Sequence, residues 1–250
     1  MTIWASCKDR AEPIPLDGEL IRIVESQEQI ATNVLVDSLE EQALLEELLE
    51  AAKPLSPYAT HGLHYLLATP FRYPPLKHGS RFGQRREPSL FYGAIDQGAA
   101  LAETAYYRFV FWSGMRSPPP SACLTTEHTA FGARYNAERG LRLQEAPFHD
   151  HEASLTNPKD YGSTQQLGQD LREAGIDAFE YRSARDPERG INIALFHPRC
   201  FSIPRPLWQE AWLCELRKDR VSFYAKAHGT RRYRRVQFLV EGELPAPAIS

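Results

Sequence analysis

Three arginines in one loop are the first residues of this chain whose type and spacing could do chemistry. Arg81, Arg85 and Arg86 lie in the stretch GSRFGQRREPS, which also contains two glycines. A guanidinium group offers paired N–H donors to phosphate oxygens, and glycines let backbone N–H groups approach an anion closely. The loop is therefore a candidate phosphate site, although taken alone an exposed and solvated basic loop is the simpler interpretation.

A tyrosine and a glutamate follow this loop. Tyr92 stands at the end of a predicted strand, and Glu103 lies in the largely apolar stretch AALAETAYY on a predicted helix. Glutamates on helices are usually exposed. A glutamate held instead in a polar pocket among these apolar residues would be a candidate for catalysis.

A serine and an asparagine form the third group, within FEYRSARDPERGINIALF. Ser183 follows one predicted strand, and Asn192 opens the next. By themselves they are typical of a polar turn between strands, an interpretation that Asp186, Pro187 and Gly190 support.

The order of these groups along the chain is more informative than any one of them. The chain has an Arg-Phe-Gly loop, a tyrosine at a strand end, Ala-x-x-Glu on a helix, and Ser-Ala-Arg-Asp before a strand with asparagine. In this order they resemble the RES-domain family, which is named after its Arg, Glu and Ser. We match those three residues to Arg81, Glu103 and Ser183.

The resemblance covers roughly residues 60–200 and is most specific over 79–107 and 181–198. It leaves open whether the second loop arginine of the family corresponds to Arg85 or to Arg86. The fold that it implies is similar to that of ADP-ribosyltransferases, an α+β fold with a mixed or antiparallel β core and flanking helices.

The resemblance also implies an activity and a partner. RES domains are the toxin halves of toxin–antitoxin pairs; family members degrade NAD⁺, some by phosphorolysis, and at least one type ADP-ribosylates a protein. We therefore expect an NAD⁺ phosphorylase or glycohydrolase, with NAD⁺ as substrate and inorganic phosphate as a candidate co-substrate. The expected partner is a cognate DNA-binding antitoxin whose C-terminal segment plugs the active site.

The residue types suit that chemistry. Cleavage of the nicotinamide–ribose bond passes through an oxocarbenium-like state with positive charge on the ribose, which a nearby carboxylate stabilises. Glu103 is the candidate for this catalytic role. Ser183 and Asn192 would orient ribose or amide groups, and we count Ser183 with Glu103 among the catalytic residues.

The arginines and the tyrosine would hold the rest of the substrate. Arg81, together with Arg85 as the second arginine, would grip the pyrophosphate or inorganic phosphate, and we also place Arg81 in the catalytic group. Tyr92 would stack on the nicotinamide ribose or hydrogen-bond to it. No metal is expected, because nicotinamide is already a good leaving group and the eight histidines show no H-E-x-x-H or Cys/His pattern.

Two other functions compete with NAD⁺ breakdown. The same site would serve an ADP-ribosyltransferase that modifies a protein target. A non-enzymatic binding module, for nucleic acid or for an antitoxin alone, is the alternative of another class. Its best signal is a basic run with an interleaved aromatic residue, formed by Arg231, Arg232, Tyr233, Arg234 and Arg235. A formal net charge of −3 favours reading this run as the solvated face of a strand.

The elements that must position these residues mix helices and strands without regular β-α-β alternation, which predicts an α+β fold. Leucines at helical spacing predict a packing helix over 38–53, and residues 54–80, which contain several prolines, are expected to be irregular. We expect further helices at 98–112 and 163–174, with strands at 19–24, 89–95, 176–181 and 191–196, several β-rich pieces within 121–145, and C-terminal strands at 212–217, 221–227 and 233–241.

Composition limits the remaining possibilities. With 250 residues, 42% of them hydrophobic, and no low-complexity linker, we expect one domain over 1–250, in which extensions flank a core at about 60–200. No signal-peptide pattern or apolar run of membrane-spanning length is present, so we expect a cytoplasmic protein. The four scattered cysteines are expected to be free thiols. The sequence leaves open whether the protein forms a homo-oligomer.

Overall fold

The fold is built on one eight-stranded sheet. The computed structural model describes residues 1–26, 36–52, 58, 60, 62–73 and 79–245. The strands are β1 (Ile14–Glu25), β2 (Phe91–Ala94), β3 (Leu124–Arg142), β4 (Ala178–Arg182), β5 (Ile191–Leu195), β6 (Trp208–Leu216), β7 (Arg220–Ala225) and β8 (Gly229–Arg234).

The long strand β3 organises this sheet. The strand order is β1-β2-β5-β4-β3-β6-β7-β8, and β1 also pairs with β3, so that the first five strands close into a ring from which β6, β7 and β8 extend. Among the described strands, only the β3–β4 pair is parallel. The expectation of an α+β fold with a mixed or antiparallel β core and flanking helices is confirmed.

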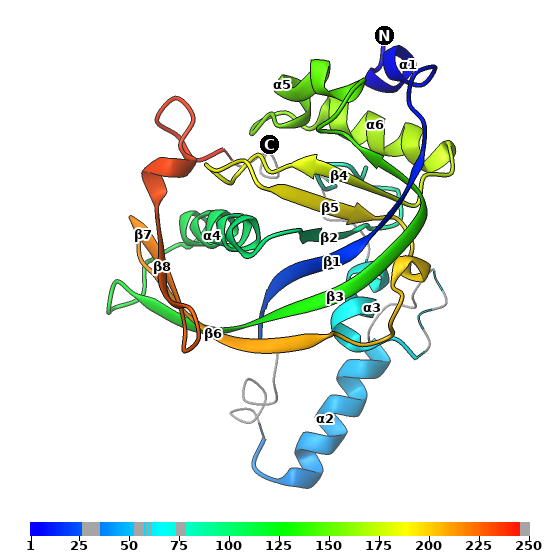
Figure 1. Cartoon of the computed structure of the whole chain (residues 1–250). Coiled ribbons are helices and arrows are strands. Elements are labelled where there is room, and N and C mark those ends of the chain that lie inside the picture. The colour runs from blue at the N-terminus through cyan, green and yellow to red at the C-terminus, as the bar shows by residue number, and fades with distance from the viewer. Residues whose placement is uncertain (27–35, 53–57, 59, 61, 74–78, 246–250) are drawn as a thin grey trace.

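Helices cover this sheet unevenly. The helices are α1 (Ile3–Cys7), α2 (Leu39–Ala52), α3 (Tyr65–Arg72), α4 (Gln97–Ser113), α5 (Glu152–Leu155) and α6 (Gly162–Glu173), with 3₁₀ turns η2 (Phe148–His151), η3 (Pro198–Cys200) and η4 (Arg235–Phe238). Figure 1 shows α4 on the concave side of the curved sheet, α1, α5 and α6 together at one end, and α2 projecting from the other. No helix within the described ranges is long and apolar enough to cross a membrane.

The alanines of α4 explain why this helix lies so close to the sheet. Ala99, Ala102 and Ala105 are fully buried, and their small side chains let the helix backbone approach β1, β2 and β5. Further along α4, Phe109 packs in one apolar cluster with Trp212 of β6 and other residues. The close approach brings the polar residues of α4 next to the ends of β2 and β5.

Most of the predicted elements are confirmed, with three corrections. The β-rich pieces within 121–145 are one strand, β3, and the irregular stretch 54–80 contains α3 in its described part. The predicted strand 233–241 is wrong beyond Arg234, because the chain turns into η4 there and buries Phe238 against the aromatic residues of α4.

The leucine stripe of α2 does not pack as expected. Ser38 caps the helix as predicted, since its Oγ accepts a hydrogen bond from the N–H of Glu41 at 3.1 Å. However, Leu44 and Leu48 are 55% and 58% exposed. The predicted stop at Pro54 lies outside the described residues. The four cysteines are free thiols, as expected.

Candidate active site

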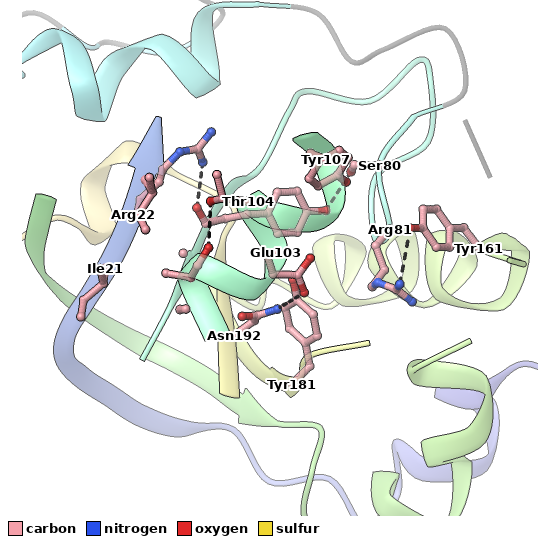
Figure 2. Close-up of a pocket in the computed structure, with 15 residues that line it drawn as sticks. Ile21, Arg22, Ser80, Arg81, Glu103, Thr104, Tyr107, Tyr161, Tyr181 and Asn192 are labelled. Atoms are coloured by element: carbon pink, nitrogen blue, oxygen red, sulfur yellow. Dashed lines mark hydrogen bonds between the residues drawn. The ribbon is translucent and has the colours of Figure 1, made fainter. Parts of the chain in front are cut away.

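A pocket of about 400 Å³ lies where α4 crosses the ends of the central strands. Its walls come from β1, the loop at 80–81, β2, α4, the start of α6, β4 and β5. Figure 2 shows side chains from these separate parts of the chain converging on it, among them Arg22, Arg81, Glu103, Tyr161 and Asn192. The pocket therefore joins all three groups that the sequence singled out.

Glu103 is held in a fixed orientation inside this pocket. Its Oε1 accepts hydrogen bonds from Ser183 Oγ at 2.6 Å and from Asn192 Nδ2 at 2.8 Å. Both donors are only 3% exposed. Within the described part of the chain no hydrogen bond reaches the second oxygen, Oε2. Glu103 therefore has one oxygen committed to the protein and one free to contact a ligand.

Ser183 uses its whole hydrogen-bonding capacity. Besides donating to Glu103, its Oγ accepts from the N–H of Arg185 at 3.1 Å and of Asp186 at 3.0 Å. The turn that looked like a simple polar connection is thus the structure that fixes the direction of the Ser183 hydroxyl. Ser183 itself does not line the pocket and contacts it through Glu103.

Asn192 is oriented by the same carboxylate and leaves an acceptor unused. Because its Nδ2 donates to Glu103, the amide oxygen Oδ1 must face the other way. This oxygen is buried and has no hydrogen-bond partner within the described residues. A buried acceptor without a partner costs about 1–3 kcal/mol, so a bound group with an N–H or O–H donor would stabilise this position.

Arg81 lies at one end of the pocket and is 9% exposed. Its Nη1 donates to the carbonyl oxygens of Asn157 at 2.9 Å and Leu155 at 3.3 Å. Its guanidinium carbon lies 4.4 Å from the centre of the Tyr161 ring. Part of the donor capacity of Arg81 is therefore used to hold the protein itself.

Tyr92 holds the loop that carries Arg81. Its hydroxyl is 2.8 Å from Ser80 Oγ and accepts from the N–H of Phe82 at 3.2 Å. Burial raises the pKa of Tyr92 to about 12, so the hydroxyl keeps its proton. The ring of Tyr92 lines the pocket while its hydroxyl is engaged by the loop, which leaves stacking as the more available of its two predicted contacts.

A second arginine in the pocket is Arg22, which the sequence analysis did not single out. It lies on β1, its Nη1 donates to the carbonyl oxygen of Tyr92 at 2.7 Å, and Figure 2 shows it on the opposite side of Glu103 from Arg81. Burial lowers its pKa to about 10, so it keeps its charge at neutral pH. The only feature of the sequence that could have indicated Arg22 as a site residue is its place between Ile21 and Ile23 in a predicted strand.

Arg85 and Arg86 lie elsewhere. Both side chains are exposed, and neither lines the pocket. The second arginine that lines the pocket is thus Arg22, from β1, and not an arginine of the loop. The basic run on β8 does not reach the pocket either, and Tyr233 in that run packs inward against Phe223.

Arg185 and Tyr161 complete the surroundings of the site and were also missed. Arg185 Nη2 donates to Tyr161 Oη at 3.0 Å, and its guanidinium carbon lies 3.7 Å from the centre of the Tyr106 ring. Tyr161 thus contacts both Arg81 and Arg185. Their partners come from segments more than twenty residues away in sequence, so no local pattern could have indicated the cluster.

The arrangement combines an oriented carboxylate with two guanidinium groups. It can place a negative charge beside a developing cation while its arginines hold an anionic part of the same ligand. Within the described residues there is no group of three or more His, Cys, Asp or Glu side chains that could hold a metal ion. The oriented carboxylate and the guanidinium groups themselves offer charge stabilisation and positioning.

Comparisons with known proteins identify the family and a similar fold. The RES domain model matches residues 56–217. A chain in the crystal structure of the M. tuberculosis MbcT–MbcA toxin–antitoxin complex has a similar fold, with a TM-score of 0.51, 11% sequence identity, and coverage of 86% of this chain and 92% of that chain. The search of curated proteins gives no match. Since the domain model covers more than half of the sequence, the chain belongs to the RES-domain family.

Proposed function

We propose that this protein is an enzyme that cleaves the nicotinamide–ribose bond of NAD⁺ and acts as the toxin of a toxin–antitoxin pair. The observation that carries the proposal is the position of Glu103, whose Oε1 is held by Ser183 and Asn192 while Oε2 is left for a ligand. Membership of the RES family and the toxin–antitoxin complex among the similar structures support it.

The cleavage step requires stabilisation of a ribose cation. As the bond to nicotinamide breaks, its electron pair leaves with the nicotinamide and positive charge develops on the ribose. The carboxylate of Glu103 stabilises that charge, and Oε2 can accept a hydrogen bond from a ribose hydroxyl. The two hydrogen bonds to Oε1 prevent the carboxylate from rotating away, so little reorganisation is needed during the reaction.

The arginines place the ribose next to Glu103. Arg22 and Arg81 lie on opposite sides of the carboxylate in Figure 2, and both line the pocket. One guanidinium can bind the pyrophosphate of NAD⁺, and the other is available for inorganic phosphate as the nucleophile. Attack of a phosphate oxygen on the ribose carbon would give ADP-ribose-1″-phosphate, whereas attack of water would give ADP-ribose.

The first experiment is an NAD⁺ consumption assay with purified protein, with and without inorganic phosphate, in which products are resolved by mass. ADP-ribose-1″-phosphate that forms only with phosphate would identify a phosphorylase. Free ADP-ribose in both conditions would identify a glycohydrolase. A labelled protein band from labelled NAD⁺ and cell extract would indicate transfer instead.

A negative result is informative only with controls. Circular dichroism must show that the protein is folded, and mass spectrometry must show that no partner protein is bound, because an antitoxin would inhibit the enzyme. Under those conditions, the absence of NAD⁺ loss, with and without phosphate or extract, would contradict the proposal.

A further inference from the structure

The segment from Pro147 to Tyr161, here called the wall segment, consists of two single helical turns followed by an irregular stretch. It holds the 3₁₀ turn η2 and the four-residue helix α5, and it ends at Tyr161, which lines the pocket. Single helical turns are not stable by themselves in water. Its position must therefore be set by contacts with the rest of the chain.

The first set of contacts comes from the active site. Arg81 donates to the carbonyl oxygens of Leu155 and Asn157, and Arg185 donates to that of Pro158 at 2.9 Å. Both arginines are less than 10% exposed. The position of the wall segment thus determines how the guanidinium of Arg81 is oriented and how many of its N–H groups can face a substrate.

The N-terminus provides a second set of contacts. Trp4 stacks on Phe148, with ring centres 6.4 Å apart and an interplanar angle of 14°. Ser6 Oγ is 2.9 Å from His151 Nε2, and the buried thiol of Cys7 lies 3.5 Å from the carbonyl oxygen of Pro147. Ile3 and Cys7 also belong to the apolar cluster that contains Phe82, the neighbour of Arg81.

The C-terminal segment provides a third set from another side. Lys159 in the wall segment forms an ion pair with Glu241. Tyr106 of α4, on whose ring Arg185 stacks, donates its hydroxyl to the carbonyl oxygen of Pro245. Trp4 and Glu241 thus both contact the wall segment, although they are far apart in the sequence.

We infer that the two chain ends are positioning elements that set the wall segment, and through it Arg81 and Tyr161, for binding of the substrate. Helix α1 and residues 239–245 lie outside the part of the chain that matches the RES domain, residues 56–217. The effect on NAD⁺ binding rests on the proposed function, whereas the effect on the wall segment does not. Loosening either end should weaken binding of the substrate more than it slows bond cleavage, because Glu103 is held by Ser183 and Asn192 instead.

The test compares Trp4→Ala and Glu241→Lys with matched controls in the full-length protein. Lys8→Ala changes an exposed residue next to α1, and Glu243→Lys makes the same charge change two residues from Glu241. Hydrogen exchange followed by mass spectrometry reports on the wall segment, and kcat and KM for NAD⁺ report on the site. Circular dichroism and thermal unfolding show whether each variant is folded.

We expect faster exchange in residues 147–161 for both test variants and for neither control. The KM for NAD⁺ should rise about ten-fold or less for Trp4→Ala, and about five-fold or less for Glu241→Lys, because an exposed ion pair contributes little. In both, kcat should change less than KM. Adding Lys159→Glu to Glu241→Lys restores an ion pair with reversed charges and should return the exchange and KM towards those of the wild type.

Two outcomes separate this inference from the proposed function. Unchanged exchange of residues 147–161 in both folded test variants would overturn the inference, whatever the activity. Faster exchange in a protein whose wild type does not consume NAD⁺ would support the coupling of the chain ends to the wall segment and reject the proposed substrate. Equal losses of kcat in test and control variants, with KM unchanged, would also overturn the inference.

Discussion

Ser183 Oγ lies 2.6 Å from Glu103 Oε1, although the two residues are eighty positions apart in the sequence. Ser183 directly follows β4, and Glu103 lies on α4. Ser183 Oγ also accepts hydrogen bonds from the backbone N–H groups of Arg185 and Asp186. A hydroxyl has one hydrogen to donate, and with both acceptor positions filled that hydrogen is directed at the carboxylate. The orientation of Glu103 therefore depends on the turn after β4.

Replacing this serine should slow the reaction without weakening substrate binding much. Ser183→Ala removes the donor to Glu103 and leaves two buried N–H groups without an acceptor. The unsatisfied N–H groups lower the stability of the turn, whereas the lost hydrogen bond to the charged Glu103 contributes about 1.5–3 kcal/mol to its orientation. We therefore expect kcat to fall by about ten- to a hundred-fold, with a smaller change in KM. Ser202→Ala, at an exposed serine, is the control. Unchanged kcat in a folded Ser183→Ala variant would contradict the positioning role.

Replacing the carboxylate itself should have a larger effect. Glu103→Gln keeps the shape of the side chain and an acceptor for Ser183, but it removes the negative charge that stabilises the ribose cation. We expect NAD⁺ cleavage to fall by about a hundred-fold or more, while circular dichroism shows an intact fold. A folded variant with full activity would mean that Glu103 is not the catalytic carboxylate.

Arg81 and Arg85 are predicted to behave differently although they lie in one loop. A lysine at position 81 has a compact ammonium group instead of the planar guanidinium, so it cannot keep the contacts to Leu155 and Asn157 and also bind a phosphate through two parallel hydrogen bonds. Arg81→Lys should therefore raise the KM for NAD⁺ by about ten-fold or more. Arg85→Lys should leave KM unchanged, because its side chain is exposed and outside the pocket. Steady-state kinetics of both variants checks this, and an equal effect of the two would place Arg85 in the site as well.

A glycine of α6 sets how closely the loop of Arg81 packs. A Cβ atom at Gly168 would lie 1.8 Å from the carbonyl oxygen of Phe82. Ala is favoured over Gly inside a helix by about 1 kcal/mol, but shifting a packed backbone costs about 1–3 kcal/mol, so Gly168→Ala should lower both the melting temperature and the affinity for NAD⁺. Gly114→Ala is the control, because its Cβ would be 3.6 Å from the nearest atom. Equal melting temperatures for the two variants would refute the argument.

Alkaline pH should unfold the protein through its buried tyrosines. Burial raises the pKa of Tyr92, Tyr106 and Tyr135 to about 12 each, whereas tyrosine in an unfolded chain titrates near pH ~10. Between these values the unfolded state binds fewer protons than the native state. The contribution of these tyrosines to the free energy of unfolding is therefore fully present below pH ~10, and it is lost as the pH rises towards ~12.

Arg22 acts in the opposite direction, because burial lowers its pKa to about 10. One arginine does not offset three tyrosines, so the free energy of unfolding still decreases as the pH rises. Urea unfolding at several pH values, with tyrosinate absorbance as a second signal, measures this slope. Tyr135→Phe removes one of these three tyrosine hydroxyls and should make the decrease of the free energy of unfolding with pH shallower. A stability that stays constant from pH ~10 to ~12 would contradict the assignment.

Local order in the sequence was enough to predict the main elements and the central residues of the site. Sequence patterns predicted β1 and α4, and the order of Arg81, Glu103 and Ser183 along the chain indicated the family. These signals are local or depend on the order of short motifs, which the chain carries before it folds. The same signals could not tell whether 121–145 formed one strand or several, because its length follows from three different pairing partners.

The tertiary structure decided which polar residues face the pocket and which face solvent. Arg85 has the same side chain as Arg81 and lies in the same loop, yet only Arg81 turns inward, onto the wall segment. Arg22 enters the pocket because β1 closes a ring of strands with β3, and Tyr161 reaches Arg81 only where α6 packs beside the loop at 79–83. The main elements and the family could thus be inferred from local patterns in the sequence. Which side chains line the site depends on contacts between segments far apart in the chain, and no local pattern encodes these contacts. The reason is that the burial of a side chain and the residues that it contacts are set by the packing of the whole fold.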